Sequence, residues 1–256
     1  QKLGGDRPTV RRVLAAVVAS AGELRTLNLS QNKLDAEDAQ ALAPALTKTS
    51  LARVSGGLTS IDLSRNQLCG ISTDDNGYQQ GTYTAEGIAA IADALGVHGG
   101  LTKISLASNM LGEEGTKAIC EALEQNQTLK EFDLSGYNNI GGEAGAKHVA
   151  DMLGVNGALT SVKLRDNKLG DEGWGAIFAG ICGNKDSKIM SLDASSENIG
   201  PAGVKLIAEA LRTSVTGALA SVDLSGNHLT DYGRDMTGIK ELAAALGVNG
   251  GLTKIE

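Results

Sequence analysis

Tyrosines are the side chains in this sequence best suited to anchoring a partner, because each combines a large apolar ring with a hydroxyl group. All four tyrosines fall between a predicted strand and the helix that follows it, and an arginine accompanies the last one. Two of the segments concerned are insertions, CGISTDDNGYQQGTY from Cys69 and TDYGRDMT from Thr230. We expect these segments to contact a partner, and the alternative is that they fold back over neighbouring turns. The candidate contacts are Tyr78, Tyr83, Tyr137, Tyr232 and Arg234.

A second set of candidates consists of aspartates at the centre of short segments in which apolar and polar residues alternate. Such alternation is typical of strands with one buried face, so the central aspartates are expected to face solvent. A basic partner could be steered by this row of carboxylates. The alternative is that the row is merely a hydrated feature of the repeat. The aspartates are Asp62, Asp133, Asp193 and Asp223.

Catalytic and metal-binding patterns are lacking. The three histidines lie far apart in the sequence, without cysteines or paired carboxylates at metal-ligand spacing. The segment Ser72–Gly77 faintly resembles a calcium loop, but Tyr83 stands where the bidentate glutamate would be needed. No phosphate-binding, nucleophile-elbow or zinc-protease motif occurs. We therefore expect no enzyme activity, no metal and no cofactor.

Charge and cysteine content narrow the class of protein further. The formal net charge is −7, and Lys and Arg residues are adjacent only at Arg11-Arg12, so nucleic acid is not an expected partner. No apolar run approaches the length of a membrane span. The cysteine count is three, and no CxxC spacing occurs, which favours reduced thiols and a cytoplasmic location.

The elements that would position these residues recur as a repeat. The pattern L-x-x-L-x-L-x-x-N-x-L runs from Leu24 to Leu34, and each copy predicts a short strand, a turn and then a helix. The asparagine amide can bond the main chain of the turn and hold successive turns in register. In two irregular copies an asparagine, Asn139 or Asn198, stands one place before the apolar residue rather than two. The later copies begin at Leu58, Leu101, Leu129, Leu159, Ile189, Leu219 and Leu252.

Units of about 28 residues that include a full helix resemble the ribonuclease-inhibitor class of leucine-rich repeats. That class also includes the Ran GTPase-activating protein and the sensor regions of NLR immune receptors. The resemblance implies an α/β solenoid bent into a horseshoe, with parallel strands on the concave face and helices on the convex face. About seven complete repeats with partial ends are expected, as one domain over residues 1–256. Because neither end has a polar capping repeat and the chain begins with Gln1, we expect it to be part of a longer array.

The resemblance also implies a function, that of a non-catalytic scaffold that binds another protein. Insertions after the strands of a solenoid emerge on one edge, which is where the tyrosines would lie. One alternative is a GTPase-activating protein similar to the Ran activator, in which an arginine acts from a loop after a strand. Arg234 is loosely comparable, although its loop lies late in the chain. Another alternative is a structural subunit of a cytoskeletal or flagellar assembly.

Two further residues give structural expectations. Trp174 occupies a helix position that is largely apolar in other repeats, so we expect it to pack between helices. Pro44 falls inside a predicted helix over residues 35–48 and is expected to kink or shorten it.

Overall fold

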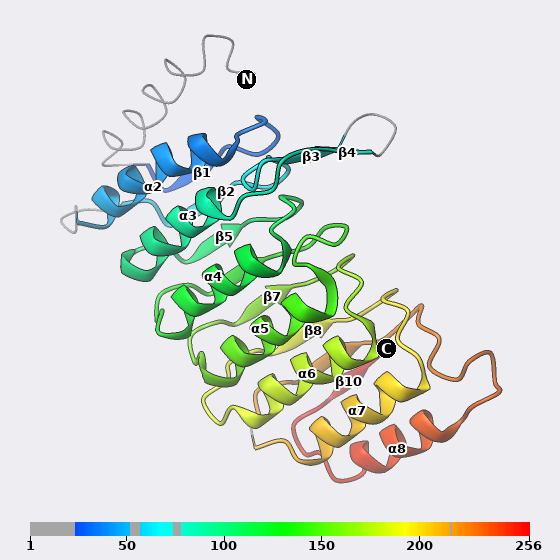
Figure 1. Cartoon of the computed structure of the whole chain (residues 1–256). Coiled ribbons are helices and arrows are strands. Elements are labelled where there is room, and N and C mark those ends of the chain that lie inside the picture. The colour runs from blue at the N-terminus through cyan, green and yellow to red at the C-terminus, as the bar shows by residue number, and fades with distance from the viewer. Residues whose placement is uncertain (1–23, 52–56, 74–77, 216) are drawn as a thin grey trace.

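The chain forms a row of strand–helix units, seen here in a computed structural model that describes residues 24–51, 57–73, 78–215 and 217–256. Within these residues seven strands are each followed by a helix, and one more strand comes after the last helix. Figure 1 shows the helices stacked side by side on one face with the strands behind them. The predicted helix over residues 9–19 and the partial repeat at residues 1–4 lie outside the described residues.

The strands are short because each repeat places only one residue in the core between two polar neighbours. The middle residue is buried in β2, β5, β6, β7, β8 and β9. The repeat strands are β1 (Thr26–Asn28), β2 (Ser60–Asp62), β5 (Lys103–Ser105), β6 (Glu131–Asp133), β7 (Ser161–Lys163), β8 (Ser191–Asp193), β9 (Ser221–Asp223) and β10 (Lys254–Ile255). The helices are α2 (Ala36–Leu51), α3 (Glu86–Val97), α4 (Gly112–Glu124), α5 (Gly142–Val155), α6 (Gly170–Gly183), α7 (Pro201–Arg212) and α8 (Thr237–Leu246).

The parallel ladder is interrupted once within the described strands. Strands β1, β2, β5, β6 and β7 form one sheet, and β8, β9 and β10 form another, while α6 and α7 stay packed across the interruption. The turn before β8 is two residues longer than the turn before β7, since Asn184 precedes Ile189 by five positions whereas Asn156 precedes Leu159 by three.

The core consists of similar apolar layers, one from each repeat. The layer of β6 and α5 is typical, because its strand, turn and helix residues are all almost completely buried: Leu129, Phe132, Leu134, Ile140, Ala146, Val149 and Leu153. Trp174 is fully buried on α6, and its ring lies 6.5 Å from that of Phe178. The expectation that Trp174 is a packing residue is confirmed.

Pro44 does not shorten its helix, so that part of the expectation is wrong. Helix α2 continues past Pro44 to Leu51. Pro44 is exposed, whereas its neighbours Leu42 and Leu46 are buried. Pro44 therefore lies on the solvent-facing side of the helix, and apolar burial on the opposite side holds the helix together.

The insertion after β2 contains a hairpin, which the sequence had not indicated. Strands β3 (Ile71–Thr73) and β4 (Gln79–Gly81) pair antiparallel and project beyond the row of repeats (Figure 1). The base of the hairpin is tight, because a Cβ atom on Gly81 would lie 2.1 Å from the carbonyl oxygen of Gly70. Both glycines also have positive φ angles, 76° and 105°, which residues with side chains rarely adopt.

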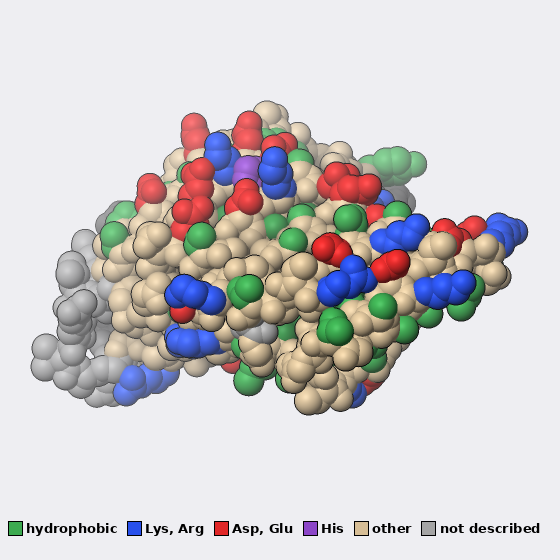
Figure 2. Space-filling view, turned by 90° about the horizontal axis from the view of Figure 1, so that it is seen from below, with side chains coloured by type: hydrophobic (Ala, Val, Ile, Leu, Met, Phe, Trp, Pro, Cys, Tyr) green, Lys and Arg blue, Asp and Glu red, His purple; other side chains and the backbone are tan. Residues whose placement is uncertain are grey.

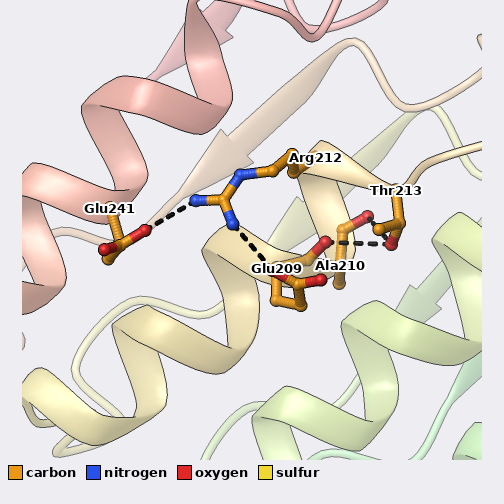
Figure 3. Close-up of polar contacts among 5 residues, drawn as sticks. All are labelled: Glu209, Ala210, Arg212, Thr213 and Glu241. Atoms are coloured by element: carbon orange, nitrogen blue, oxygen red, sulfur yellow. Dashed lines mark hydrogen bonds and ion pairs between the residues drawn. The ribbon is translucent and has the colours of Figure 1, made fainter.

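Polar contacts tie the last two helices together on the outer face. Arg212 at the end of α7 binds Glu209 on its own helix at 2.8 Å and Glu241 on α8 at 2.6 Å (Figure 3). The side chain of Thr213 donates a hydrogen bond to the main-chain oxygen of Glu209, which closes the end of α7.

Candidate protein-binding surface

The turn after each strand is built around a buried amide. The Nδ2 atom of Asn66 donates to the carbonyl oxygens of Leu29, 3.0 Å away in the preceding repeat, and of Leu63, 2.8 Å away in its own. Its Oδ1 atom accepts hydrogen bonds from the main-chain N–H groups of Asn32 and Leu34, each at 3.0 Å. One side chain thus joins two repeats, and the predicted asparagine register is confirmed.

Left-handed residues flank the amide in these turns. Asp166 and Lys168 have φ angles of 66° and 55° on either side of Asn167. Asparagine, aspartate and glycine tolerate this region better than most residues, but the lysine shows that the hydrogen-bonded turn can impose it. The turn is therefore strongly constrained, which fixes the direction of the side chains that leave it.

The two irregular repeats place different residue types at the ladder position. Asn139 is the ladder residue of its turn, since it bonds the carbonyl oxygens of Leu106 and Leu134 and accepts from the N–H of Asn109. In the other irregular repeat, the ladder position belongs to Glu197 and not to Asn198. Asn198, which stands one place before Ile199 in the sequence, is therefore not the ladder residue. Its φ angle of 60° places it in the flanking left-handed position, as Lys168 is in the preceding repeat.

Glu197 lies where the two sheets separate. Its Oε1 atom accepts a hydrogen bond of 2.8 Å from the N–H of Asp166, and its side chain is buried. Burial raises the pKa of the Glu197 carboxyl above its ordinary value, while the Asp166 N–H and the nearby Trp174 indole oppose the shift. The Trp174 N–H is close to this carboxylate but is buried without a hydrogen bond of good geometry. A longer, acceptor-only side chain has therefore replaced the amide that elsewhere donates to its own repeat and to the preceding one.

Tyr137 leaves the turn after β6 and is 63% exposed. Lys168, from the next repeat, places its Nζ atom 4.0 Å from the centre of the Tyr137 ring and donates a hydrogen bond to the tyrosine hydroxyl. The ring is held by a cation on one side and stays accessible on the rest of its surface.

Tyr232 and Arg234 lie together in the turn before α8. Tyr232 is 79% exposed, and its ring lies 5.2 Å from that of His228. The Arg234 guanidinium is largely exposed and lies 3.8 Å from the carboxylate of Asp231. This turn projects on the same side of the molecule as the β3–β4 hairpin (Figure 1). We call the exposed parts of these post-strand turns the tyrosine edge, consisting of Tyr78, Tyr137, Tyr232 and Arg234.

The two tyrosines of the insertion differ in their surroundings. Tyr78 is 71% exposed beside β4. Tyr83 is only partly exposed, because its hydroxyl donates to the carbonyl oxygen of Leu111 at 2.6 Å and accepts from the N–H of Gly115 at 3.2 Å. Tyr83 thus anchors the insertion to the next repeat, in agreement with the alternative that these segments cover neighbouring turns.

The four aspartates of the second set lie on the strands as expected, but each is partly used by its own turn. Oδ1 of each one accepts a hydrogen bond from the N–H of the serine two residues later, at 2.9 or 3.0 Å. The row is not continuous, since Asp62 and Asp133 have Ser105 between them, and Lys163 follows Asp133 on β7. Asp193 and Asp223 are adjacent. Hydrogen bonds from Ser225 lower the pKa of the Asp223 carboxyl.

Beside Asp62 and Asp133 the strand face is hollowed. A polar depression of about 420 Å³ is lined by both aspartates together with Arg65 and Lys103. Lys103 forms an ion pair of 2.8 Å with Glu131 on the neighbouring strand. The N-terminal part of this face therefore presents charges of both signs rather than a purely acidic row.

Sequence reasoning missed a second amide ladder on the opposite edge, where helices return to strands. Asn156 donates from Nδ2 to the carbonyl oxygens of Leu123 and Asn126 and accepts from the N–H groups of Ala158 and Leu159. The spacing N-x-x-L at Asn126, Asn156 and Asn249 carried this signal. His98 takes the same position, where Nδ1 accepts from Gly100 and Leu101 at 3.2 and 2.9 Å.

The remaining side chains offer little for metal chemistry. Among the described residues no group of three or more histidine, cysteine or acidic side chains could hold a metal ion. All three cysteines are free and buried, and burial raises the pKa of the Cys69 thiol to about 12.

No described helix is long and apolar enough to cross a membrane.

Comparisons with known proteins agree with the repeat geometry. A family model described as "Leucine Rich repeat" matches residues 24–43, 125–147 and 158–178. Human NACHT, LRR and PYD domains-containing protein 13 is 30% identical over 150 residues, which cover 59% of this chain and 12% of that protein. Ribonuclease inhibitor from Sus scrofa is 29% identical over 175 residues, covering 66% of this chain and 32% of the inhibitor. The chain thus spans less than half the length of either relative.

A solved structure supports the fold alone. The leucine-rich-repeat-containing protein LegL7 from Legionella pneumophila aligns with a TM-score of 0.56 at 20% identity, covering 96% of this chain and 68% of that one. The ladders, the strand–helix units and these matches define a leucine-rich-repeat solenoid. Within that fold class, the chain is similar to the ribonuclease inhibitors and to NACHT- and LRR-containing proteins.

Proposed function

We propose that this chain is a non-catalytic scaffold that binds another protein through the tyrosine edge. The observation that carries the proposal is the pair Tyr137 and Tyr232, two largely exposed aromatic rings that leave strongly constrained turns on one edge. A partner would gain aromatic contact area without having to order a loop. The similarity to ribonuclease inhibitor supports a protein-binding function, since that relative is by name a protein that acts on another protein.

The aspartate row has a secondary role in this proposal. Asp193 is exposed and its neighbour Asp223 is partly exposed, and they would steer a partner with a basic patch rather than anchor it. We place the protein in a reducing compartment such as the cytoplasm, because its three thiols are buried and none forms a disulfide.

The test uses a photoreactive amino acid placed at one position at a time. Incorporated at Tyr137 or Tyr232, it should crosslink to a native partner in extracts of the source cell, and mass spectrometry would identify that partner. Val248 is the matched control, because it is similarly exposed but lies in a helix-to-strand turn. With the identified partner, Tyr137→Ala and Tyr232→Ala should each weaken binding about tenfold or more, while Val248→Ala should not. Equal crosslinking from the control, or binding that survives both tyrosine changes, would refute the edge proposal.

One alternative retains support from a single feature. Arg234 is an exposed arginine in a post-strand turn, as a GTPase-activating protein would require. GTP hydrolysis by a panel of small GTPases tests this alternative. Stimulation that is lost in Arg234→Ala but kept in Arg234→Lys would show only a charge requirement, whereas loss in both would favour a bidentate arginine role. No stimulation removes the alternative and leaves the scaffold proposal intact.

A further inference from the structure

A groove runs between α5 and α6 on the helical face, away from the tyrosine edge. It has a volume of about 970 Å³ and extends from Gly141, just before α5, to Val155 at the end of α5, and from Glu172 to Gly180 along α6. A helix of 14 residues, the length of α5, measures roughly 21 Å. The groove is therefore long enough to receive about four turns of another helix lying alongside.

The groove is open because the residues between the two helices are small. A Cβ atom on Gly180 would lie 2.4 Å from the carbonyl oxygen of Ala150, so the two helices pack at close backbone distance. The outward positions carry Ala144, Ala176 and Ala179, which leave an apolar floor that no side chain covers. The next helix pair is different, since Leu206 of α7 lies over Gly175 of α6 and fills the corresponding space.

The charge around this floor is strongly one-sided. Helices α4, α5 and α6 together carry eight carboxylates against two lysines, a net charge of −6. Four charged side chains line the groove, the carboxylates Glu143, Asp151 and Glu172 and one lysine, Lys147. The three carboxylates form no ion pair among the described residues. Figure 2 shows acidic side chains gathered along the upper margin of the view, around a histidine and a few basic groups.

We propose that this groove binds an amphipathic helix of a partner protein, with an apolar stripe on the alanine floor and basic side chains over the carboxylate rim. Apolar anchors at helical spacing would fill the hollow, as in other helix-in-groove complexes. A second copy of this chain fits poorly, because no described helix carries more than two lysines or arginines and the helical face would meet a surface of its own sign. The site is separate from the tyrosine edge and does not depend on it.

A synthetic peptide tests the proposal directly. The probe is a fluorescein-labelled helix of about four turns with leucines at positions i, i+4 and i+7 and lysines elsewhere, titrated by anisotropy at roughly physiological salt. It should bind saturably, and a scrambled peptide of equal composition and a glutamate-for-lysine analogue should bind at least about tenfold more weakly. Ala179→Trp, which fills the groove, and the double change Glu143→Lys with Glu172→Lys should each reduce affinity at least about tenfold.

Matched variants outside the groove separate this effect from general damage. Ala244→Trp on α8 changes an exposed alanine in the same way, and Asp93→Lys on α3 reverses a charge beyond the acidic helices, so neither should alter peptide binding. Thermal denaturation should give similar midpoints for all four variants. Three results would each overturn the proposal: unchanged peptide affinity in Ala179→Trp, equal affinity for the scrambled peptide, or self-association of the wild type that Ala179→Trp abolishes. Tyr137→Ala should bind the peptide normally, so failure here and failure of the edge proposal are distinguishable.

Discussion

Replacing Glu197 with asparagine should restore the amide ladder at the place where it is interrupted. The equivalent residue in the next repeat, Asn227, makes four hydrogen bonds shorter than 3 Å. It donates to the carbonyl oxygens of Ala194 and Leu224, both at 2.8 Å, and accepts from the N–H groups of Glu197 and Ile199, both at 2.9 Å. Glu197 as an acceptor makes one such bond, and it cannot donate.

The expected gain follows from counting the bonds that change. By analogy with Asn227, an asparagine at this position has two N–H groups for the carbonyl oxygens of Leu164 and Ala194. A net hydrogen bond stabilises a fold by about 0.5–1.5 kcal/mol, so two new bonds minus the bond from Asp166 leave a gain of about 1 kcal/mol. Removing a buried carboxylate adds to this gain. For a domain of this size the midpoint of thermal unfolding should rise by roughly 2–4 °C.

The effect should depend on pH, with a definite sign. Burial raises the pKa of Glu197 in the folded chain, so the folded state binds the proton more tightly than the unfolded state. The stabilising contribution of the protonated carboxyl is fully present below its unfolded pKa and is lost as pH rises through the folded pKa. The advantage of Glu197→Asn should therefore be larger at pH 7 than near pH 4. Glu197→Gln should share this pH dependence, because it removes the charge but keeps the side-chain length.

Urea unfolding at several pH values measures the free energies, and hydrogen exchange locates the change. Amides of β7 and β8 should gain protection in Glu197→Asn, whereas those of β1 and β2 should not. Glu172→Gln is the control, as it neutralises an exposed carboxylate. If Glu197→Asn destabilises the chain at pH 7, or if protection at β7 and β8 is unchanged, the carboxylate does not cause the interruption.

Four other substitutions have directions fixed by the structure. His98→Asn should make the chain less sensitive to acid. Burial lowers the pKa of His98 in the folded chain, so the stability contributed by the neutral imidazole is lost as the pH falls from the unfolded pKa near 6.5 through the lower folded pKa. The free energies of unfolding at pH 5 and pH 7.5 measure this loss in variant and wild type. Tyr83→Phe should cost about 1–2 kcal/mol of stability in a urea titration, because it leaves a buried carbonyl oxygen without its 2.6 Å bond. Gly180→Ala should cost about 1–3 kcal/mol in the same assay, since the new methyl group would meet the carbonyl oxygen of Ala150 at 2.4 Å; no loss would mean that α5 and α6 separate readily. Arg212→Ala should cost less than about 1 kcal/mol despite its two ion pairs, because they are exposed, and added salt should reduce the difference between variant and wild type.

The repeat was predictable because its signal is redundant. Each apolar position of the frame recurs in several copies, so strand, turn and helix could be assigned without knowing any contact. The buried amide of Asn66 follows from the same frame. The second ladder was equally regular at Asn126, Asn156 and Asn249 but lies outside the motif that defines the class, so it was overlooked.

The features that could not be predicted depend on the backbone geometry of individual repeats. Asn198 sits next to the apolar residue, yet Glu197 fills the ladder, because φ angles and not residue type decide which side chain points inward. The β3–β4 hairpin depends on the close approach of Gly70 and Gly81, which no periodic pattern reports. Tyr83 looked like the other tyrosines in sequence, and only its distance of 2.6 Å from a main-chain oxygen distinguishes it.

Whether an exposed side chain already bonds the main chain also decides whether it is available for a partner. Oδ1 of Asp133 is already bonded to Ser135, so a partner would have to use the remaining oxygen or displace a bond that supports the turn. The rings of Tyr137 and Tyr232 do not support a turn in this way, and Tyr137 is 63% exposed and Tyr232 79% exposed. Aromatic area that the fold does not use can be buried at little cost to the scaffold, whereas carboxylates that support turns are costly to recruit. This difference favours the tyrosine edge over the strand centre as the anchoring surface, with the aspartates limited to long-range attraction.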